Sequence, residues 1–329
     1  MREGLPPIGY MRRRPQSALV FYSMNYLLHT MVRVELYGLR LPEVKPGDDL
    51  ARLIVEGASR EAGGLRDGDV LVIASKVVSK SYGLLIDMRR VKPSKKALRI
   101  ARKTGMNPRM VQAVLENCDR VLFLIPIKLI ADRFFDGFMK LAENPENARR
   151  ALELIPYMLV VRRGLQVYTD AGLDFSNHPE NVASIPPENP DLYARKLRKR
   201  IKELSGMDVA VVISDTECFP GIGSIDLARG SSGIEVVSRR FGALDRFGKP
   251  KFGGVDRVAD QLASAAALLM GQTAEGIPVV LVRGLRYVRR EEGVLDHTLE
   301  PEAVKHIFRL ILRENIRVLG LRYLLRLIA

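Results

Sequence analysis

Polar side chains that can bind a metal ion and a phosphate chain form four groups, three of them after expected strands and one in a loop before a strand. The first group, residues 74–80, comes directly after a buried strand at 69–74. Its Ser75, Lys76 and Lys80 offer hydroxyl and ammonium groups to phosphate oxygens. The second group, residues 170–177, follows a strand at 166–168 and places carboxylates and an amide in a turn that contains glycine.

The other two groups complete this chemistry. Ser214, Asp215 and Thr216 end an apolar strand at 209–213, the position where a carboxylate and a hydroxyl hold magnesium on a phosphate chain. Residues 270–278 form a short loop between a helix and a strand, open to a nucleotide. Together the groups predict a metal–nucleotide site with Asp174 and Asp215 as leading metal ligands.

The elements that must position these groups follow no regular alternation of strand and helix. The pattern predicts a mixed α/β fold, rather than a doubly wound sheet, with a basic helical tail. Helices are expected at 94–104 and 107–116, and one begins after Asp48 or Asp49; the 217–233 segment, rich in glycine, is expected to be a loop. The further expected elements are strands at 32–36, 157–161 and 278–282, and helices at 127–154, 258–269 and 301–328.

Composition restricts the class of protein. The chain has 329 residues, 47% of them apolar, and carries a formal charge of +14, so it should form real cores and attract anions. The chain lacks Walker A, GxGxxG and GxSxG sequences, which disfavours P-loop proteins, Rossmann enzymes and serine hydrolases. It has only two cysteines, which disfavours a structural zinc site and indicates a reducing cytoplasm. The arginine-rich tail and residues 89–109 could form a surface that binds nucleic acid. A solvated basic face is the better interpretation, because no RNA-binding signature or recognition-helix motif accompanies them.

In these four groups, and in their order, the sequence resembles the gamma-glutamyl ligase family that adds glutamate to the deazaflavin coenzyme F420. The resemblance spans about residues 32–285. It rests on Leu41-Pro42, residues 74–80, residues 111–115, the turn at 172–177, Ser214-Asp215-Thr216, and residues 268–284.

The resemblance implies a GTP-dependent amide ligase. GTP would activate the terminal carboxylate of a deazaflavin-type acceptor, the amine of L-glutamate would attack it, and GDP and phosphate would leave. It also implies a two-lobed fold, a homodimer and two divalent ions, Mg²⁺ or Mn²⁺. The implied metal ligands are Asp174, Asp215, Thr216 and Gln272, and the implied nucleotide-binding residues are Leu41, Pro42, Ser75, Lys76, Lys80, Asn177, Gly271, Thr273 and Gly276.

Other interpretations of these residues stay open. Asp174 could cap a turn, Asp215 could pair with an arginine, and the two lysines could be solvated. The family's Asn-Gly-Arg segment after Asp-Thr is replaced here by residues 217–221, so a phosphate or substrate contact is missing. The alternative function is a paralogue that binds a nucleotide without ligase turnover or acts on another acceptor.

The ligase-like unit is expected to span residues 31–285, with one segment before it, one inserted in it and one after it. Residues 1–30 form an extension outside the core. About 125–154 form a helical insertion at the mouth of the site, where it tunes the acceptor. Residues 286–329 form a basic helical tail, and no stretch is long and apolar enough for a membrane span.

Overall fold

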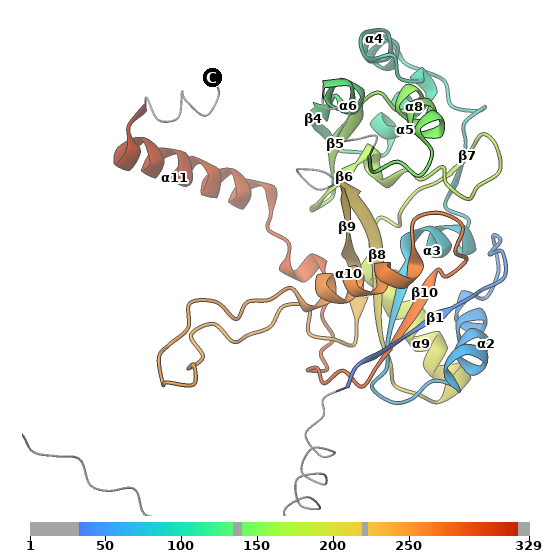
Figure 1. The fold of residues 1–329 in the computed structure, drawn as a ribbon, viewed down its shortest axis with the longest axis vertical. Helices are drawn as coiled ribbons and strands as arrows, with labels where there is room; N and C mark the ends of the chain where they lie inside the picture. Colours follow the sequence, from blue (N-terminus) through green and yellow to red (C-terminus); the bar gives the residue numbers. More distant parts are fainter. Residues whose placement is uncertain (1–32, 134–139, 219–222, 322–329) are drawn as a thin grey trace, which may run out of the picture.

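The computed structural model of this chain describes residues 33–133, 140–218 and 223–321 (Figure 1). The expected extension at 1–30 lies outside the described residues. Two lobes are visible in the described part, one above the other in Figure 1. The predicted mixed α/β fold is confirmed, because parallel and antiparallel strands alternate irregularly with helices.

The lower lobe contains a five-stranded sheet. Its strand order is β1 (Glu35–Leu39), β10 (Val279–Arg283), β2 (Val70–Ala74), β8 (Ala210–Cys218) and β9 (Ser224–Ser232). β2 and β8 run parallel, and every other pair in this sheet is antiparallel. Because helices cover both faces, the central strands read as continuous apolar runs.

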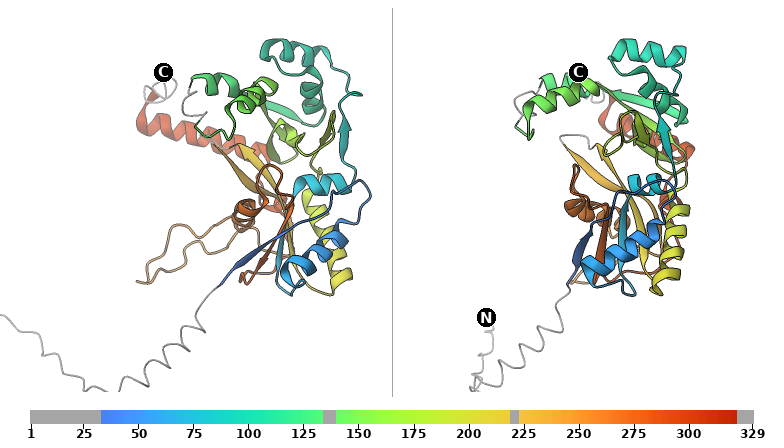
Figure 2. Two further views of the ribbon diagram at one scale, coloured as in Figure 1. Left: turned by 45° about the vertical axis from the view of Figure 1, so that its right-hand side comes forward. Right: turned by 90° about the vertical axis from the view of Figure 1, so that its right-hand side faces the viewer.

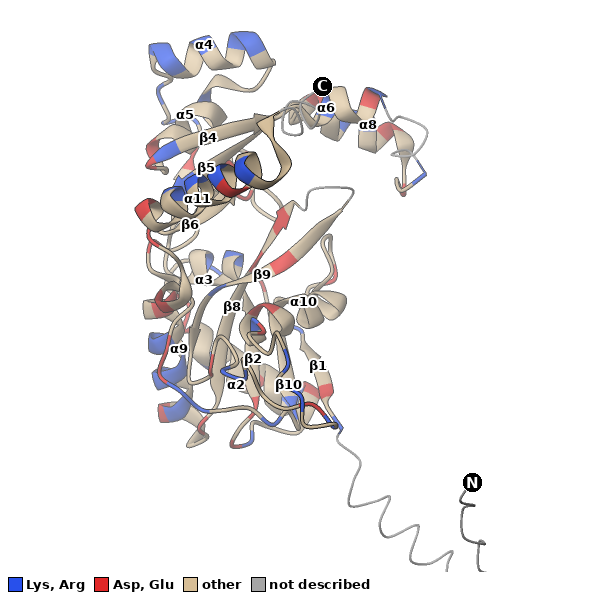
Figure 3. Cartoon of the chain, turned by 90° about the vertical axis from the view of Figure 1, so that its left-hand side faces the viewer, with Lys and Arg blue, Asp and Glu red and all other residues tan. Residues whose placement is uncertain are grey.

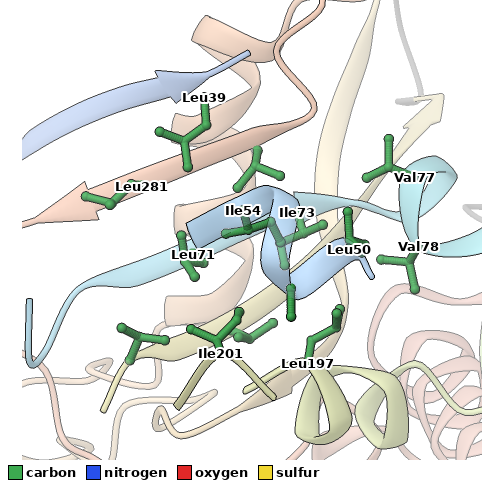
Figure 4. Close-up of a cluster of buried hydrophobic side chains, with 14 of the residues drawn as sticks. Leu39, Leu50, Ile54, Leu71, Ile73, Val77, Val78, Leu197, Ile201 and Leu281 are labelled. Atoms are coloured by element: carbon green, nitrogen blue, oxygen red, sulfur yellow. The ribbon is translucent and has the colours of Figure 1, made fainter. Parts of the chain in front are cut away.

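Successive residues of β2 face opposite layers of the lower lobe. Leu71 and Ile73 pack under α2 (Leu50–Ala62) and α9 (Pro190–Ser205), as the close-up in Figure 4 shows. The intervening valines of β2 pack under α10 (Val258–Met270) on the other face. This alternation buries a core on each side of the sheet and fixes the register of its strands.

The upper lobe has a separate core and a separate sheet. β4 (Arg120–Ile125), β5 (Met158–Arg163) and β6 (Gln166–Thr169) form an antiparallel meander. Its apolar face packs with α4 (Lys95–Thr104) and α5 (Pro108–Glu116), which begin at the predicted residues. β4 was not predicted from the sequence, and its apolar run is mostly exposed on the surface.

Short elements connect and extend the two lobes. α3 (Ser75–Ser81) follows β2 without a gap, and β3 (Leu85–Asp87) pairs with β7 (Val182–Ser184) between the lobes. Within the segment expected to be a helical insertion, the described residues form α6 (Ile127–Arg133) and α8 (Pro145–Leu154).

Two further segments project from the body in Figure 1 and in the left view of Figure 2. Residues 238–257 form a long two-stranded arm, held by main-chain hydrogen bonds such as the one from Lys251 N to Ala243 O. The C-terminal helix α11 (Pro301–Leu319) extends away from the lobes and has no buried residue. It begins where the tail helix was predicted.

Two sequence predictions about strand boundaries are wrong. The first strand spans Glu35–Leu39 instead of 32–36, where it finds β10 as a partner. The segment 217–233 is not a loop, because β8 continues to Cys218 and β9 occupies Ser224–Ser232. Antiparallel pairing along this length stabilises a sequence whose glycines and polar residues suggested a loop.

Candidate functional site

A pocket of about 550 Å³ opens where the carboxyl-terminal ends of β2 and β8 face the segment after β6. This volume is typical of a site for a small organic ligand. All thirteen residues that the sequence analysis singled out line it, although they come from five separate segments of the chain. They are Leu41, Pro42, Ser75, Lys76, Lys80, Asp174, Asn177, Asp215, Thr216, Gly271, Gln272, Thr273 and Gly276.

The two lysines reach the pocket from one turn of α3. β2 stops at Ala74 and α3 begins at once, so both lysines lie on the helix. Lys76 and Lys80 are four residues apart and therefore lie on one face of it. Lys76 Nζ lies 2.9 Å from Asp174 Oδ2. Lys80 is buried, and its Nζ donates to the main-chain oxygen of Asn177 at 2.7 Å and to the Glu43 carboxylate. Both lysines are therefore held by the pocket wall rather than solvated.

The turn after β6 carries the second group of side chains. Asp174 pairs through its main chain with Ser184 of β7, and its Oδ1 accepts hydrogen bonds from the N–H and the hydroxyl of Ser176. Asn177 has a φ of +56°, a left-handed conformation that asparagine tolerates. Its amide donates to Thr273 O at 2.9 Å, which joins the turn to the 270–278 loop across the pocket.

β8 supplies the third group from within a strand, where the sequence analysis expected the strand to end. Antiparallel pairing sets Thr216 opposite Asp226 of β9, and the Thr216 hydroxyl donates to Asp226 Oδ1 at 2.7 Å. Gln272 Nε2 donates to the same hydroxyl oxygen at 3.1 Å. Three oxygen-bearing side chains thus meet at one edge of the pocket, two of them predicted.

Asp215 points to the opposite face of β8 from Thr216, toward Ser75, which hydrogen-bonds its carboxylate. Desolvation in the pocket, together with the carboxylates of Glu217 and Asp174, raises the pKa of Asp215 to about 7, although Arg229 and Ser75 act in the opposite direction. The carboxylate is thus poorly compensated by the protein. A bound cation at this place would supply the missing positive charge.

The ion pair between Glu217 and Arg229 was not predicted from the sequence. A β-bulge makes Arg229 an extra residue in β9, and its buried guanidinium pairs with the Glu217 carboxylate. The same carboxylate accepts from the N–H and hydroxyl of Thr169, and Arg229 stacks 4.1 Å over the Tyr168 ring. These contacts connect the far end of β8 and β9 to the upper lobe. A bulge depends on pairing, so no local signal in the sequence indicates it.

The loop after α10 closes the pocket with main-chain atoms. Gly271 ends the helix at φ +63°, and a Cβ there would lie 2.2 Å from the Glu275 carboxyl carbon. Glu275 accepts from the N–H and the hydroxyl of Thr273, which holds the loop in a tight turn. The backbone angle at 271, which side chains rarely adopt, therefore favours glycine at this position.

The donor set fits a divalent ion of the magnesium type. Among the described residues no three His, Cys, Asp or Glu side chains form a cluster that could hold a metal by themselves. Asp174 and Asp215 nevertheless face the pocket with Thr216 and Gln272 nearby. Mg²⁺ commonly keeps several waters and takes only one or two carboxylates, with phosphate oxygens completing its shell.

The overall charge of the pocket lining is acidic. Its described residues include six carboxylates, those of Glu43, Asp174, Asp215, Glu217, Asp226 and Glu275, against the two lysines of α3. Glu43, Asp226 and Glu217 were not predicted; Glu43 follows Pro42 directly and could have been found as a neighbour. Fold and site together define an α/β protein with an acidic, oxygen-rich pocket suited to cations and their ligands.

Comparison with known proteins agrees with this class. The family described as F420-0:Gamma-glutamyl ligase matches residues 38–284. Similar proteins include three named coenzyme F420:L-glutamate ligase. The one from Methanopyrus kandleri is 37% identical over 253 residues, covering 76% of this chain and 87% of the relative. The one from Archaeoglobus fulgidus is 35% identical over 285 residues (86% and 99%), and the one from Methanothermobacter thermautotrophicus 34% over 271 residues (82% and 96%).

This chain belongs to the F420-0:gamma-glutamyl ligase family. The match contains the upper lobe, the sheet apart from the first three residues of β1, and every residue of the pocket lining, and it ends before α11. The resemblance on which the sequence analysis relied is confirmed.

Proposed function

We propose that this protein is a ligase that adds L-glutamate to the terminal carboxylate of coenzyme F420 or a related deazaflavin acceptor, driven by GTP and assisted by divalent metal ions. The names of its relatives support glutamate and F420 as substrates. Activation of the acceptor carboxylate by GTP lets the glutamate amine attack it. The amide forms, the amine loses a proton, and GDP and phosphate are released.

The observation that carries the metal requirement is the uneven charge of the pocket. Lys76 is paired with Asp174, Lys80 with Glu43, and the Arg229 guanidinium behind the wall with Glu217. No ion pair of the described residues compensates Asp215 and Asp226, so a triphosphate would meet net negative charge. A divalent ion between carboxylate and phosphate oxygens removes this repulsion and stabilises charge on the transferring phosphoryl group.

The residues of the pocket divide into those that would bind the metal ions and those that would bind the nucleotide. We assign the ions to Asp174, Asp215, Thr216 and Gln272, whose side-chain oxygens all belong to the pocket lining. The nucleotide phosphates would lie toward Lys76, Lys80 and Ser75, since ammonium and hydroxyl groups donate to phosphate. The remaining nucleotide contacts fall to the adjoining wall, formed by Leu41, Pro42, Asn177, Gly271, Thr273 and Gly276.

We also propose that the protein works as a homodimer in which the arm at 238–257 contacts the second copy. The arm projects from the body, and Phe247 and Phe252 on it are 85% and 93% exposed. Main-chain hydrogen bonds between its two strands keep it extended, and Arg239 at its base pairs with Glu235 and Glu292 of the body. Sedimentation velocity tests this: Phe252→Ser should weaken the dimer, and a monomeric wild type would contradict it.

The decisive test of function is mass spectrometry of the deazaflavin acceptor that lacks glutamate. With wild-type protein, GTP, L-glutamate and Mg²⁺ or Mn²⁺, the acceptor should gain one glutamyl unit, and chelation should prevent this. Asp174→Ala should lose the product, whereas Asp132→Ala, a matched change at an exposed residue of α6, should not.

Two negative results have different meanings in this test. Metal-dependent GTP binding without any glutamylated product would keep the site assignment but contradict the acceptor, as a paralogue with another substrate would behave. Absence of GTP binding to the wild type would contradict both.

A further inference from the structure

The C-terminal helix α11 presents a large apolar surface that no part of the described chain covers. None of its residues is buried, and Figure 1 shows it extending clear of both lobes. Phe308 is 67% exposed and Val318 is 64% exposed. Monomeric proteins rarely leave such a continuous apolar surface in water, so the helix should have a binding partner.

Most apolar residues of α11 lie on a different side of the helix from the basic residues, and Ile316 is the exception, between Lys305 and Arg309. At 100° per residue, Val304, Phe308, Ile311 and Leu319 fall within one arc, and other large apolar residues widen this arc on both flanks. The opposite side is the basic face, which consists of Lys305, Arg309, Arg313 and Arg317. The charge colouring of Figure 3 shows basic residues recurring along this helix.

The basic face retains positive charge after its internal pairs are counted. Lys305 pairs with Glu302, and Arg317 pairs with Glu314. Arg309 and Arg313, in its centre, make no ion pair with any residue that the structure describes. The helix thus has a free cationic centre directly beside a broad apolar surface.

This combination fits a lipid surface better than a second helix. A coiled-coil seam needs a narrow apolar stripe, whereas the apolar residues of α11 spread over a much wider arc; the two seams that start at Val304 meet Glu314 and Asn315. A wide apolar arc flanked by arginines is typical of helices that lie in the headgroup region of an anionic bilayer. No helix in the described part of the chain is long and apolar enough to cross a membrane, so α11 would lie on the surface.

We propose that α11 docks the protein on anionic lipid membranes, with its apolar side seated among the acyl chains and Arg309 and Arg313 among the acidic headgroups. The family match ends at residue 284, before this helix, so the docking function is separate from the ligase core. It stands or falls independently of the activity proposed above.

The test is co-sedimentation of the full-length protein with vesicles of phosphatidylcholine, with or without phosphatidylglycerol. Wild type should bind the vesicles that contain phosphatidylglycerol and not the zwitterionic ones. Arg309→Glu with Arg313→Glu should weaken binding at least about tenfold, because each reverses a headgroup contact. Phe308→Ser with Leu312→Ser should weaken it similarly, by removing the inserted surface.

The matched control is Arg195→Glu with Lys199→Glu on α9. These exposed residues have the same spacing and give the same change in net charge, but lie on the body. The control should bind vesicles nearly as wild type does, and thermal unfolding should confirm that each variant is folded.

Four results would overturn the proposal: no binding of wild type, equal binding to zwitterionic vesicles, equal loss in the α9 control, or unchanged binding by either α11 variant. A variant that turns a dimer into a monomer yet still binds vesicles would assign α11 to a subunit contact instead.

Discussion

β2 and β8 are parallel neighbours in the central sheet, and in both a similar apolar run is followed by polar residues. The polar residues after β2 lie on a helix, whereas those of β8 lie on the strand itself. β2 ends at Ala74, and the chain turns at once into α3, so Ser75, Lys76 and Lys80 lie on a helix. β8 continues through Ser214 to Cys218, so Asp215 lies on a strand.

The difference lies in the neighbours that each strand finds. β9 pairs with β8 as far as Cys218 and supplies hydrogen bonds to its polar half. On the β10 side of β2, Ala74 N donates to Pro278 O, one residue before β10 begins. A strand continues where a partner satisfies its main chain, whatever its side chains. One wall of the pocket is therefore helical and cationic, and the other is extended and acidic.

The largest effect should come from breaking the connection that holds β8 and β9 to the upper lobe. Arg229→Ala leaves the Glu217 carboxylate without its buried cation and should cost about 3–5 kcal/mol in unfolding free energy. Urea denaturation measures it. Arg89→Ala, at an exposed pair with Asp87, is the control and should cost less than about 1 kcal/mol. Equal losses would show that the buried pair has no special role.

The acidic wall should matter more for ligand binding than the cationic one. Asp215→Ala removes a charged oxygen from the proposed ion site, and we expect metal-dependent GTP affinity to fall at least about a hundredfold. Isothermal titration with GTP and Mg²⁺ measures this change. Affinity within a few-fold of wild type would remove Asp215 from the ligand set.

A pH effect is expected at Asp170, which lies behind this wall and accepts a hydrogen bond from Leu159 N. Burial raises the pKa of Asp170 to about 6, and the nearby Glu217 raises it too, while the bond from Leu159 opposes them. Since the folded pKa exceeds the unfolded one, the stabilisation is complete below about pH 4 and is lost as pH rises through 6.

Asp170→Asn removes this titration, and asparagine tolerates the left-handed backbone there. Relative to wild type, the variant should be about 2 kcal/mol more stable near pH 7 than near pH 4, judged by urea denaturation. Asp67→Asn is the control, because this exposed carboxylate also accepts a main-chain N–H. A constant difference between Asp170→Asn and wild type across pH would refute the prediction.

The smallest effect is expected on the helical wall. Lys80→Ala should weaken GTP binding only about tenfold, because Glu43 already neutralises part of its charge and other donors remain. The same titration measures this, with Lys45→Ala as an exposed control. A loss as large as that of Asp215→Ala would mean that the lysine, rather than the metal, carries most of the phosphate charge.

Most elements could be predicted because their signals are local. Asp49, Ser94 and Asn107 cap their helices through side-chain hydrogen bonds, and such caps can be read from a few residues. β9 could not be predicted, because its glycines and polar residues favour a loop until β8 pairs with them. β4 could not be predicted, because its short apolar run is compatible with a helix or a strand equally.

The sequence by itself determined which side chains would meet. The order of polar residues after apolar strands, with the family resemblance, selected thirteen residues that line one pocket. Only the tertiary structure decided how they are held and charged: that Lys76 and Lys80 are already paired, and that Asp226 joins Thr216 across two strands. Ion pairs and cross-strand contacts join residues far apart in the chain, and their energy exists only once the fold has excluded water between them.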